Sequence, residues 1–473
     1  MQHLYFSFKS KLSHSYNIAI NAISSKIDFK SNNSQEQYER ALEADTLLTR
    51  VEERYQSTKR EDVQPDTITY SNVIKAWANA GKPREAEAIL NRMITLSENS
   101  ERDVKPNLIS FNTVIDAWAK SKEPNAAENA LNILQQMENI SESLNDTSIY
   151  PDTISYSSAI SAMARSEKRN AGLQAVELLE RSLELYSNGM ETLKPDSISF
   201  CTTLDALSKQ SKFDEECIRV AQQIFRRMKQ MGEDSDSSVQ PTTIAYNIML
   251  KIFASSGEIK ELKLLFEDML HSYKKGDIHV APDDITYNTY LSALSNAKEG
   301  AYVKEALRML REWEEDENVN LSVNAYVHIL GALAKQTRHG ENFLKEMEKL
   351  LDSLEERFLD GKSEIIPNTA CYNCYIDALS KCASLKDKST RAMEVLTRMK
   401  NFSKQCPSSL TLPLPDAITY TSIINTISYS KNDNTKLAED LISQMKVEGL
   451  KPNRYTYNSL VSELSTTLSY SSM

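Results

Sequence analysis

The sequence contains little glycine and no long apolar run. Only 11 of its 473 residues are glycine, too few for phosphate-binding glycine loops or for the many tight turns of a β-sandwich. No stretch approaches the run of about 18 apolar residues that predicts a transmembrane helix, so no membrane contact is expected. The six histidines are scattered, without a His-Glu-x-x-His pair on one helix, and no catalytic arrangement is expected.

Cysteine is also scarce, and acidic residues outnumber basic ones. The formal net charge is −11, whereas a basic surface is the usual footprint of a nucleic-acid-binding protein. Six cysteines make a sparse disulfide framework for a chain this long, so reduced thiols are expected. Cys371, Cys374 and Cys382 lack a fourth ligand at zinc-like spacing. We interpret them as ordinary helix residues and expect no metal and no cofactor.

What the sequence does contain is an internal repeat. The segment Pro65-Asp66-Thr67-Ile68-Thr69-Tyr70-Ser71 recurs as Pro106-Asn107-Leu108-Ile109-Ser110-Phe111-Asn112, and nine of the 13 prolines open such a copy. Periods of this length, from 37 to 54 residues between aromatic anchors, predict a solenoid or a propeller. The anchors, of which the first and Tyr326 lack the proline, are Tyr16, Tyr70, Phe111, Tyr156, Phe200, Tyr246, Tyr287, Tyr326, Tyr372, Tyr420 and Tyr457.

Each copy predicts two helices. Apolar residues follow the anchor at helical spacing, as in Ile74 and Trp77, and a second helix carries small and large apolar residues in turn, as in Ala86, Leu90 and Met93. Such a hairpin buries its apolar face only by stacking on its neighbours, so the sequence predicts an all-α solenoid rather than a propeller. Trp77 and Trp118 are predicted to lie in the hairpin core.

The length differences between copies are predicted to follow the second helix. The extra residues are polar and often acidic, as in Glu98-Asn99-Ser100-Glu101 and Glu233-Asp234-Ser235-Asp236. We expect them to form loops at one edge of the stack, which would place much of the negative charge away from any groove.

The repeats divide the chain into three predicted segments. These are 1–66, a degenerate N-terminal repeat with an insertion; 67–453, an array of about nine repeats; and 454–473, a truncated terminal repeat. Residues 1–27 contain no Asp or Glu, as in some organelle transit peptides. Because Tyr16 already belongs to the repeat, a transit peptide and a late start of the sequence are both open.

The Pro-Asp-x-Ile-Thr-Tyr-Asn opening and the Ala-x-x-x-Leu-x-x-Met pattern of the second helix resemble the pentatricopeptide-repeat family, from about Ser13 to the C-terminus. The tetratricopeptide repeat lacks this opening. The resemblance implies a right-handed superhelical solenoid of stacked antiparallel helix-turn-helix repeats that binds single-stranded RNA, one base per repeat. It implies a location in the mitochondrion or plastid and a role in RNA processing, stability or translation. A final repeat opens at Tyr457, so we expect a P-type array without a C-terminal catalytic domain, and no enzyme.

The resemblance also implies base-reading residues. In the family, each base is read by the residue after the anchor and the residue after the next opening proline. Two pairs, Cys201 with Thr242 and Val327 with Asn368, match no clear rule, and Asn288 with Ser322 matches weakly. The other seven pairs are Asn17 with Asp66, Ser71 with Asn107, Asn112 with Asp152, Ser157 with Asp196, Asn247 with Asp283, Asn373 with Asp416, and Thr421 with Asn453.

Hydrogen-bonding capacity explains why such pairs discriminate. An ionised Asp only accepts hydrogen bonds, which suits uracil or guanine, whereas Asn also donates, which suits adenine or cytosine. A short Ser or Thr leaves room for a purine, and a longer Asn favours a pyrimidine. The predicted order along the repeats is U, A, U, G, unread, U, pyrimidine, unread, U, A.

Two further sets of residues recur around the anchor. The residue two before the anchor is mostly isoleucine, which either sandwiches the bases, as in the family, or packs at the start of the helix. The residue nine past the anchor is often basic, which either binds phosphates or favours the negative end of the helix dipole. The isoleucines are Ile68, Ile109, Ile154, Ile198, Ile244, Ile285 and Ile418, and the cations are Lys120, Arg165, Lys209, Lys335 and Lys381.

Two alternatives to direct RNA reading are open at this point. Helical solenoids also serve as protein-interaction scaffolds, which the acidic charge favours. The chain could instead be a non-catalytic subunit of a ribonucleoprotein. The alternation of Asn, Ser or Thr after the anchor with Asp or Asn after the proline favours RNA, because a scaffold has no need of it.

Overall fold

The structure, a computed structural model, describes residues 15–25, 34–98, 104–144, 146–210, 214–234, 238–297, 299–316, 319, 321–407, 412–428 and 435–461. Every regular element within these ranges is helical, which confirms the all-α prediction. The N-terminal stretch considered as a transit peptide lies mostly outside them.

Helices alternate along the chain as the repeat predicts. The first helices of the repeats are α3 (Thr67–Asn79), α5 (Leu108–Lys120), α7 (Thr153–Arg165), α9 (Ser197–Gln210), α11 (Thr243–Ser256), α13 (Asp284–Asn296), α15 (Val323–Gln336), α17 (Thr369–Lys381) and α19 (Ala417–Ser428). The second helices are α2 (Ser34–Thr58), α4 (Pro83–Glu98), α6 (Ala126–Leu144), α8 (Ala171–Ser187), α10 (Glu215–Asp234), α12 (Ile259–Lys274), α14 (Gly300–Glu314), α16 (Asn342–Leu359), α18 (Lys388–Gln405) and α20 (Thr435–Val447).

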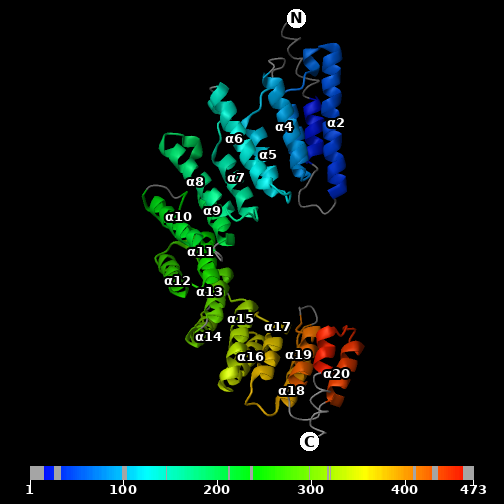
Figure 1. The fold of residues 1–473 in the computed structure, drawn as a ribbon, viewed down its shortest axis with the longest axis vertical. Helices are drawn as coiled ribbons and strands as arrows, with labels where there is room; N and C mark the ends of the chain where they lie inside the picture. The colour runs from blue at the N-terminus through cyan, green and yellow to red at the C-terminus, as the bar shows by residue number, and fades with distance from the viewer. Residues whose placement is uncertain are drawn as a thin grey trace. The chain divides into compact units, whose positions relative to one another are not determined.

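The helices group into two compact units, residues 1–252 and 253–473. In the first unit, α3, α5, α7 and α9 contact one another in chain order and form one layer, and each packs on the second helix that follows it (Figure 1). The second unit repeats this arrangement, with α13, α15, α17 and α19 in one layer and α14, α16, α18 and α20 against it. Within each unit the predicted stack of helical hairpins is therefore confirmed.

The predicted core residues are buried. Tyr70, Ile74, Ala86, Leu90 and Met93 are fully buried in the first repeat. Trp77 and Trp118 are also buried in their hairpins, as expected. Since equivalent positions are apolar in the later copies, each hairpin contributes a similar layer to the core of its own unit.

The predicted place of the length differences is confirmed, but part of their predicted conformation is wrong. The variable segments do follow the second helix, and several contain a 3-10 turn: η1 (Glu61–Val63), η2 (Thr147–Ile149), η3 (Glu191–Leu193) and η4 (Ile278–Val280). However, Glu98, Glu233 and Asp234 end helices α4 and α10 instead of lying in loops. Glutamate is a good helix former, so no local signal stops the helix before them. Residues 99–101, 235 and 236 lie outside the described ranges.

In two repeats, hydrogen bonds through one shared glutamate link the tyrosine anchor to the second helices on either side of it. The Tyr156 hydroxyl on α7 donates to Glu138 Oε1 on α6 at 2.7 Å, and Arg181 on α8 donates to Glu138 Oε2 at 2.7 Å. The same three-residue network recurs as Glu355, Tyr372 and Arg398 on α16, α17 and α18. Burial and the adjacent carboxylate raise the pKa of Tyr156, so its hydroxyl stays protonated and donates. Each network therefore fixes three consecutive helices.

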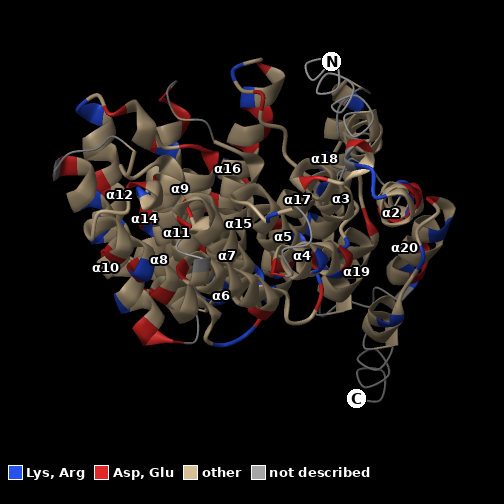
Figure 2. Cartoon of the chain, turned by 90° about the horizontal axis from the view of Figure 1, so that it is seen from above, with Lys and Arg blue, Asp and Glu red and all other residues tan. Residues whose placement is uncertain are grey.

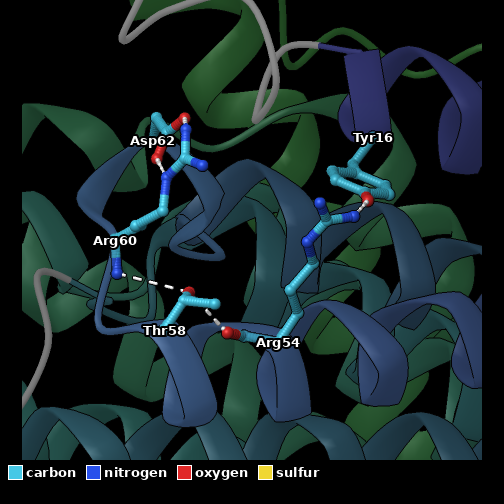
Figure 3. A network of polar contacts seen from close by, with 5 residues as sticks. All are labelled: Tyr16, Arg54, Thr58, Arg60 and Asp62. Atoms are coloured by element: carbon cyan, nitrogen blue, oxygen red, sulfur yellow. Dashed lines mark hydrogen bonds and ion pairs between the residues drawn. The ribbon is translucent and has the colours of Figure 1, made fainter.

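The first copy has a related contact. Arg54, near the end of α2, donates to the hydroxyl of Tyr16 at 3.3 Å, and Arg60 pairs with Asp62 just beyond the helix (Figure 3). Tyr16 lies in the helical residues 15–25, and Asn17 beside it is buried. The degenerate first copy thus has an anchored first helix like the later ones.

Candidate nucleic-acid interface

Most second readers, the residues after the opening prolines, are placed by their role as helix N-caps. Asp66 precedes α3 and its Oδ1 accepts the backbone N–H of Thr69 at 2.8 Å. Asp152 and Asp416 do the same for Ser155 and Thr419, at 2.9 and 2.7 Å. The opening proline therefore leads into a capped helix start, where Asp and Asn serve equally well. This structural role was missed in the sequence, although an N-cap residue followed three positions later by a Ser or Thr is a signal for it.

The first reader of a pair is the residue after the anchor. Where this residue is Asn and both readers lie in one unit, the structure brings the two side chains together. Asn17 Nδ2 donates to Asp66 Oδ1 at 3.1 Å. Asn112 and Asn373 donate likewise to Asp152 and Asp416, at 3.1 and 3.3 Å. The weakly matching pair also meets, with Asn288 Nδ2 2.9 Å from Ser322 Oγ. Asn247 and Asp283 belong to different units, and Asp283 caps α13 through the Thr286 N–H.

The pairs with a shorter first reader are arranged differently. Ser71 Oγ donates to the Thr67 carbonyl on its own helix at 2.8 Å. Ser157 and Thr421 instead meet the hydroxyls of Ser199 and Thr456 in the next repeat, at 2.7 and 2.8 Å. Asn107, Asp196 and Asn453 act as helix caps.

The two pairs without a base assignment, Cys201 with Thr242 and Val327 with Asn368, are less polar. Burial raises the pKa of Cys201 to about 11, and its side chain is hydrogen-bonded to Thr242. Burial also raises the pKa of Cys371, the residue before the Tyr372 anchor, to about 12. Both thiols are therefore neutral near pH 7 and are poor ligands for a metal ion.

The seven isoleucines two before the anchor are exposed. Their exposed fractions run from 57% at Ile285 to 67% at Ile109 and Ile198. Packing at the start of the helix therefore involves only the smaller, buried part of each side chain. Neighbouring isoleucines on the same helices, such as Ile74 and Ile115, are fully buried. The isoleucines two before the anchor therefore do not belong to the core of the hairpins.

The five predicted phosphate-binding cations lie at the ends of the first helices, and each has a partner. Arg165 donates to the carbonyl of Ala119, in the last turn of α5, at 2.6 Å. Lys209 bonds in the same way to the carbonyl of Ala164 in the preceding repeat. Lys120 pairs with Asp116, Lys381 with Asp377, and Lys335 with Asn296. The helix-end role of these residues therefore has direct contacts, while Lys120 and Lys209 keep nearly half of their side chains exposed.

A basic cleft adjoins two of these cations. Lys120, Lys122, Arg165 and Lys168 contribute to the lining of a surface cleft of about 820 Å³ between the α5–α6 and α7–α8 turns. Elsewhere, Lys and Arg are interspersed with Asp and Glu along the helices of both units (Figure 2). No group of three or more potential metal ligands occurs within the described ranges, and no helix found there is long and apolar enough to cross a membrane.

The stacked hairpins, the capped opening of each copy and the recurring polar pairs define an α-helical repeat protein. Residues 55–121 match the pentatricopeptide repeat domain, residues 244–272 match the PPR repeat, and residues 415–466 match the PPR repeat family. The chain therefore contains pentatricopeptide repeats in these three stretches.

Two known proteins are similar to this chain. A pentatricopeptide repeat-containing protein of Arabidopsis thaliana is 27% identical over 218 residues, 46% of this chain, and the chain spans only 25% of that relative's length. The crystal structure of the pentatricopeptide repeat protein PPR10 from maize aligns with 98% of this chain and 66% of its own, at a TM-score of 0.45 and 19% identity.

Proposed function

We propose that the protein binds single-stranded RNA, one base per repeat, along the layer of first helices, and that it acts by binding without catalysis. The observation that carries the proposal is the exposed isoleucine beside most of the reader pairs. A base has two apolar faces and a polar edge. Where two consecutive repeats both have the isoleucine, one from each contacts the faces, and the reader pair between them meets the edge.

The reader pairs have hydrogen-bonding groups left for a base. All side-chain contacts that the structure shows for Asp152 and Asp416 use Oδ1, which leaves Oδ2 to accept from a base. The Asn amide nitrogen uses one hydrogen toward the carboxylate and has a second one available. These groups support the predicted order U, A, U, G, unread, U, pyrimidine, unread, U, A.

The acidic net charge does not argue strongly against this function. Several carboxylates of the second-helix layer are paired, as Glu138 is with Arg181 and Glu346 with Arg311. Paired charges of opposite sign contribute little to the field at a distance. A role in processing, stability or translation of organellar RNA follows from the family and is part of the proposal, as is a location in the mitochondrion or plastid.

The experiment that tests this proposal measures the affinity of the whole chain for a decamer of the predicted sequence and for a scrambled decamer. We expect the predicted RNA to bind more tightly. The double variant Ile109→Ala/Ile154→Ala should weaken binding of both RNAs by about fivefold or more, because the bases lose apolar surface to pack against.

The matched control is Leu264→Ala, since Leu264 is 66% exposed but lies on the second helix α12. Unchanged RNA affinity in the control and weaker affinity in the double variant support the proposal. Equal losses in both, or no RNA binding by the wild-type chain, contradict it and favour a protein-interaction scaffold.

A further inference from the structure

A third polar side chain belongs to most of the reader pairs. It is the Ser or Thr directly before the aromatic anchor, three residues after the capping Asp or Asn. Thr69, Ser155 and Thr419 occupy this position in three repeats and are almost completely buried. None of them was singled out from the sequence as a site residue.

This hydroxyl contacts the first reader of the preceding repeat. Thr69 Oγ1 lies 2.6 Å from Asn17 Oδ1. Ser155 Oγ lies 2.6 Å from Asn112 Oδ1. Thr419 Oγ1 lies 2.8 Å from Asn373 Oδ1. In each case the hydroxyl lies within donating distance of two acceptors, the amide oxygen of the Asn and Oδ1 of the capping Asp. The amide nitrogen of the same Asn faces the capping carboxylate.

The two contacts together fix which way the Asn amide points. An amide rotated by 180° would set its oxygen against the carboxylate and its nitrogen against the hydroxyl proton. The hydroxyl itself is held in place, because the backbone N–H of the capping residue donates to it, at 3.1 Å in Asp66, Asp152 and Asp416. The donor and acceptor of the first reader are therefore in fixed positions before any base arrives.

The hydroxyl also tracks the reader pairs along the sequence. The three pairs that match a base weakly or not at all have Ala245, Ala325 and Cys371 at this position. The seven pairs that fit the pattern all have a hydroxyl there, in Thr69, Ser110, Ser155, Ser199, Thr286, Thr419 and Thr456.

Helix capping alone does not account for this correspondence. Asn368 caps α17 by accepting the backbone N–H of Cys371 at 3.1 Å, with no hydroxyl at that position. Ser322 caps α15 although Ala325 stands three residues later. A helix in this chain is thus capped without the hydroxyl, whereas none of the seven reader pairs that fit the pattern lacks it.

We propose that the hydroxyl before each anchor is a positioning residue for base selection, and that repeats with Ala or Cys there contribute little selectivity. The proposal rests on the RNA binding proposed above. In the Asn repeats the hydroxyl holds the amide in one orientation. In the repeats of Ser157 and Thr421 it contacts the first reader directly.

The test uses the ninth base, which Asn373 and Asp416 are proposed to read. The ratio of affinities for decamers with U and with C at that base is measured for the whole chain and for two variants. Thr419→Ser keeps the hydroxyl and should keep the preference for U. Thr419→Val keeps the size but removes the hydroxyl, and should reduce the preference by about two- to tenfold, as expected for one hydrogen bond.

The control is Thr426→Val, which removes another fully buried hydroxyl from the same helix, α19, at a position away from the readers. A loss of preference in Thr419→Val but not in Thr426→Val supports the proposal. If Thr419→Val does not fold, Ser155→Ala measured at the third base makes the same comparison.

Two results would overturn the inference, and they are distinguishable. If the wild-type chain prefers U and the variant without the hydroxyl prefers it equally, the hydroxyl serves only to cap the helix. If the wild-type chain binds RNA without any preference at these bases, the proposed base reading fails together with the inference.

Discussion

At the scale of single residues, each second reader has two roles that respond differently to substitution. Asp152 caps α7 with Oδ1, and under the proposed function it accepts a hydrogen bond from a base with Oδ2. Asn is as good an N-cap as Asp, but its side chain has only one acceptor oxygen and gains donors. Substitution at this position can therefore separate base selection from helix stability.

We predict that Asp152→Asn shifts the preference at the third base from U toward C without lowering stability. The donor nitrogen suits the acceptor edge of cytosine, and the longer partner Asn112 still favours a pyrimidine. Affinities for decamers with U, C, A and G at that base measure the shift. Asp152→Ala is the comparison, since it also loses the cap and should lower the free energy of unfolding by about 0.5–2 kcal/mol. An unchanged preference for U in Asp152→Asn would contradict the assignment.

The readers could be located from the sequence because repetition aligns them, but their contacts could not. A single Pro-Asp-x-x-Thr segment predicts a capped helix and says nothing of the side chain that meets the cap from another repeat. Asn17 and Asp66 are 49 residues apart, and only stacking brings them within 3.1 Å. The exposure of Ile109 was open for the same reason, because its neighbours are set by the packing of the hairpins.

At the scale of helices, the stack depends on polar contacts between layers as well as on its apolar core. Glu138 on α6 is buried and accepts from both Tyr156 and Arg181. The anchor at position 200 is Phe and has no hydroxyl, and the residue 18 positions before it is Ser182 instead of a glutamate. The hydroxyl and its carboxylate partner are therefore both missing in this repeat.

We predict that Tyr156→Phe lowers the free energy of unfolding of the α6–α8 region by about 1–3 kcal/mol. The buried carboxylate loses one of its two donors while the ring still fills its place in the core. Urea unfolding and amide hydrogen exchange of α6, α7 and α8 measure the change, because in a repeat protein each hairpin is stabilised mainly by its neighbours. Tyr186→Phe on α8 is the control, since that hydroxyl makes no hydrogen bond to another of the described residues. Equal stabilities of the two variants would show that the network adds nothing to the stack.

At the scale of the whole molecule, the proposed function requires an acidic chain to bind a polyanion. The described cations beside the readers are already engaged, Arg165 with the Ala119 carbonyl and Lys120 with Asp116. Binding RNA would therefore release fewer counterions than binding by a basic protein of this size, and the proposed affinity depends more on base contacts. Composition alone argues against RNA, and only the repeat pattern indicates where the proposed base contacts lie.

We predict that Lys120→Gln/Arg165→Gln weakens binding of the predicted and the scrambled decamer by the same factor, because phosphate contacts carry no sequence information. The slope of log K against log salt should become shallower by about 0.7 for each single-strand phosphate that the variant no longer neutralises, so by about 1.4 for both cations. Lys349→Gln on α16 is the control, since that side chain is 68% exposed in the second-helix layer. Arg165 also holds the end of α5, so thermal unfolding of the double variant is measured in parallel. A lower melting temperature with an unchanged salt slope would show that these cations cap helix ends and do not contact phosphates.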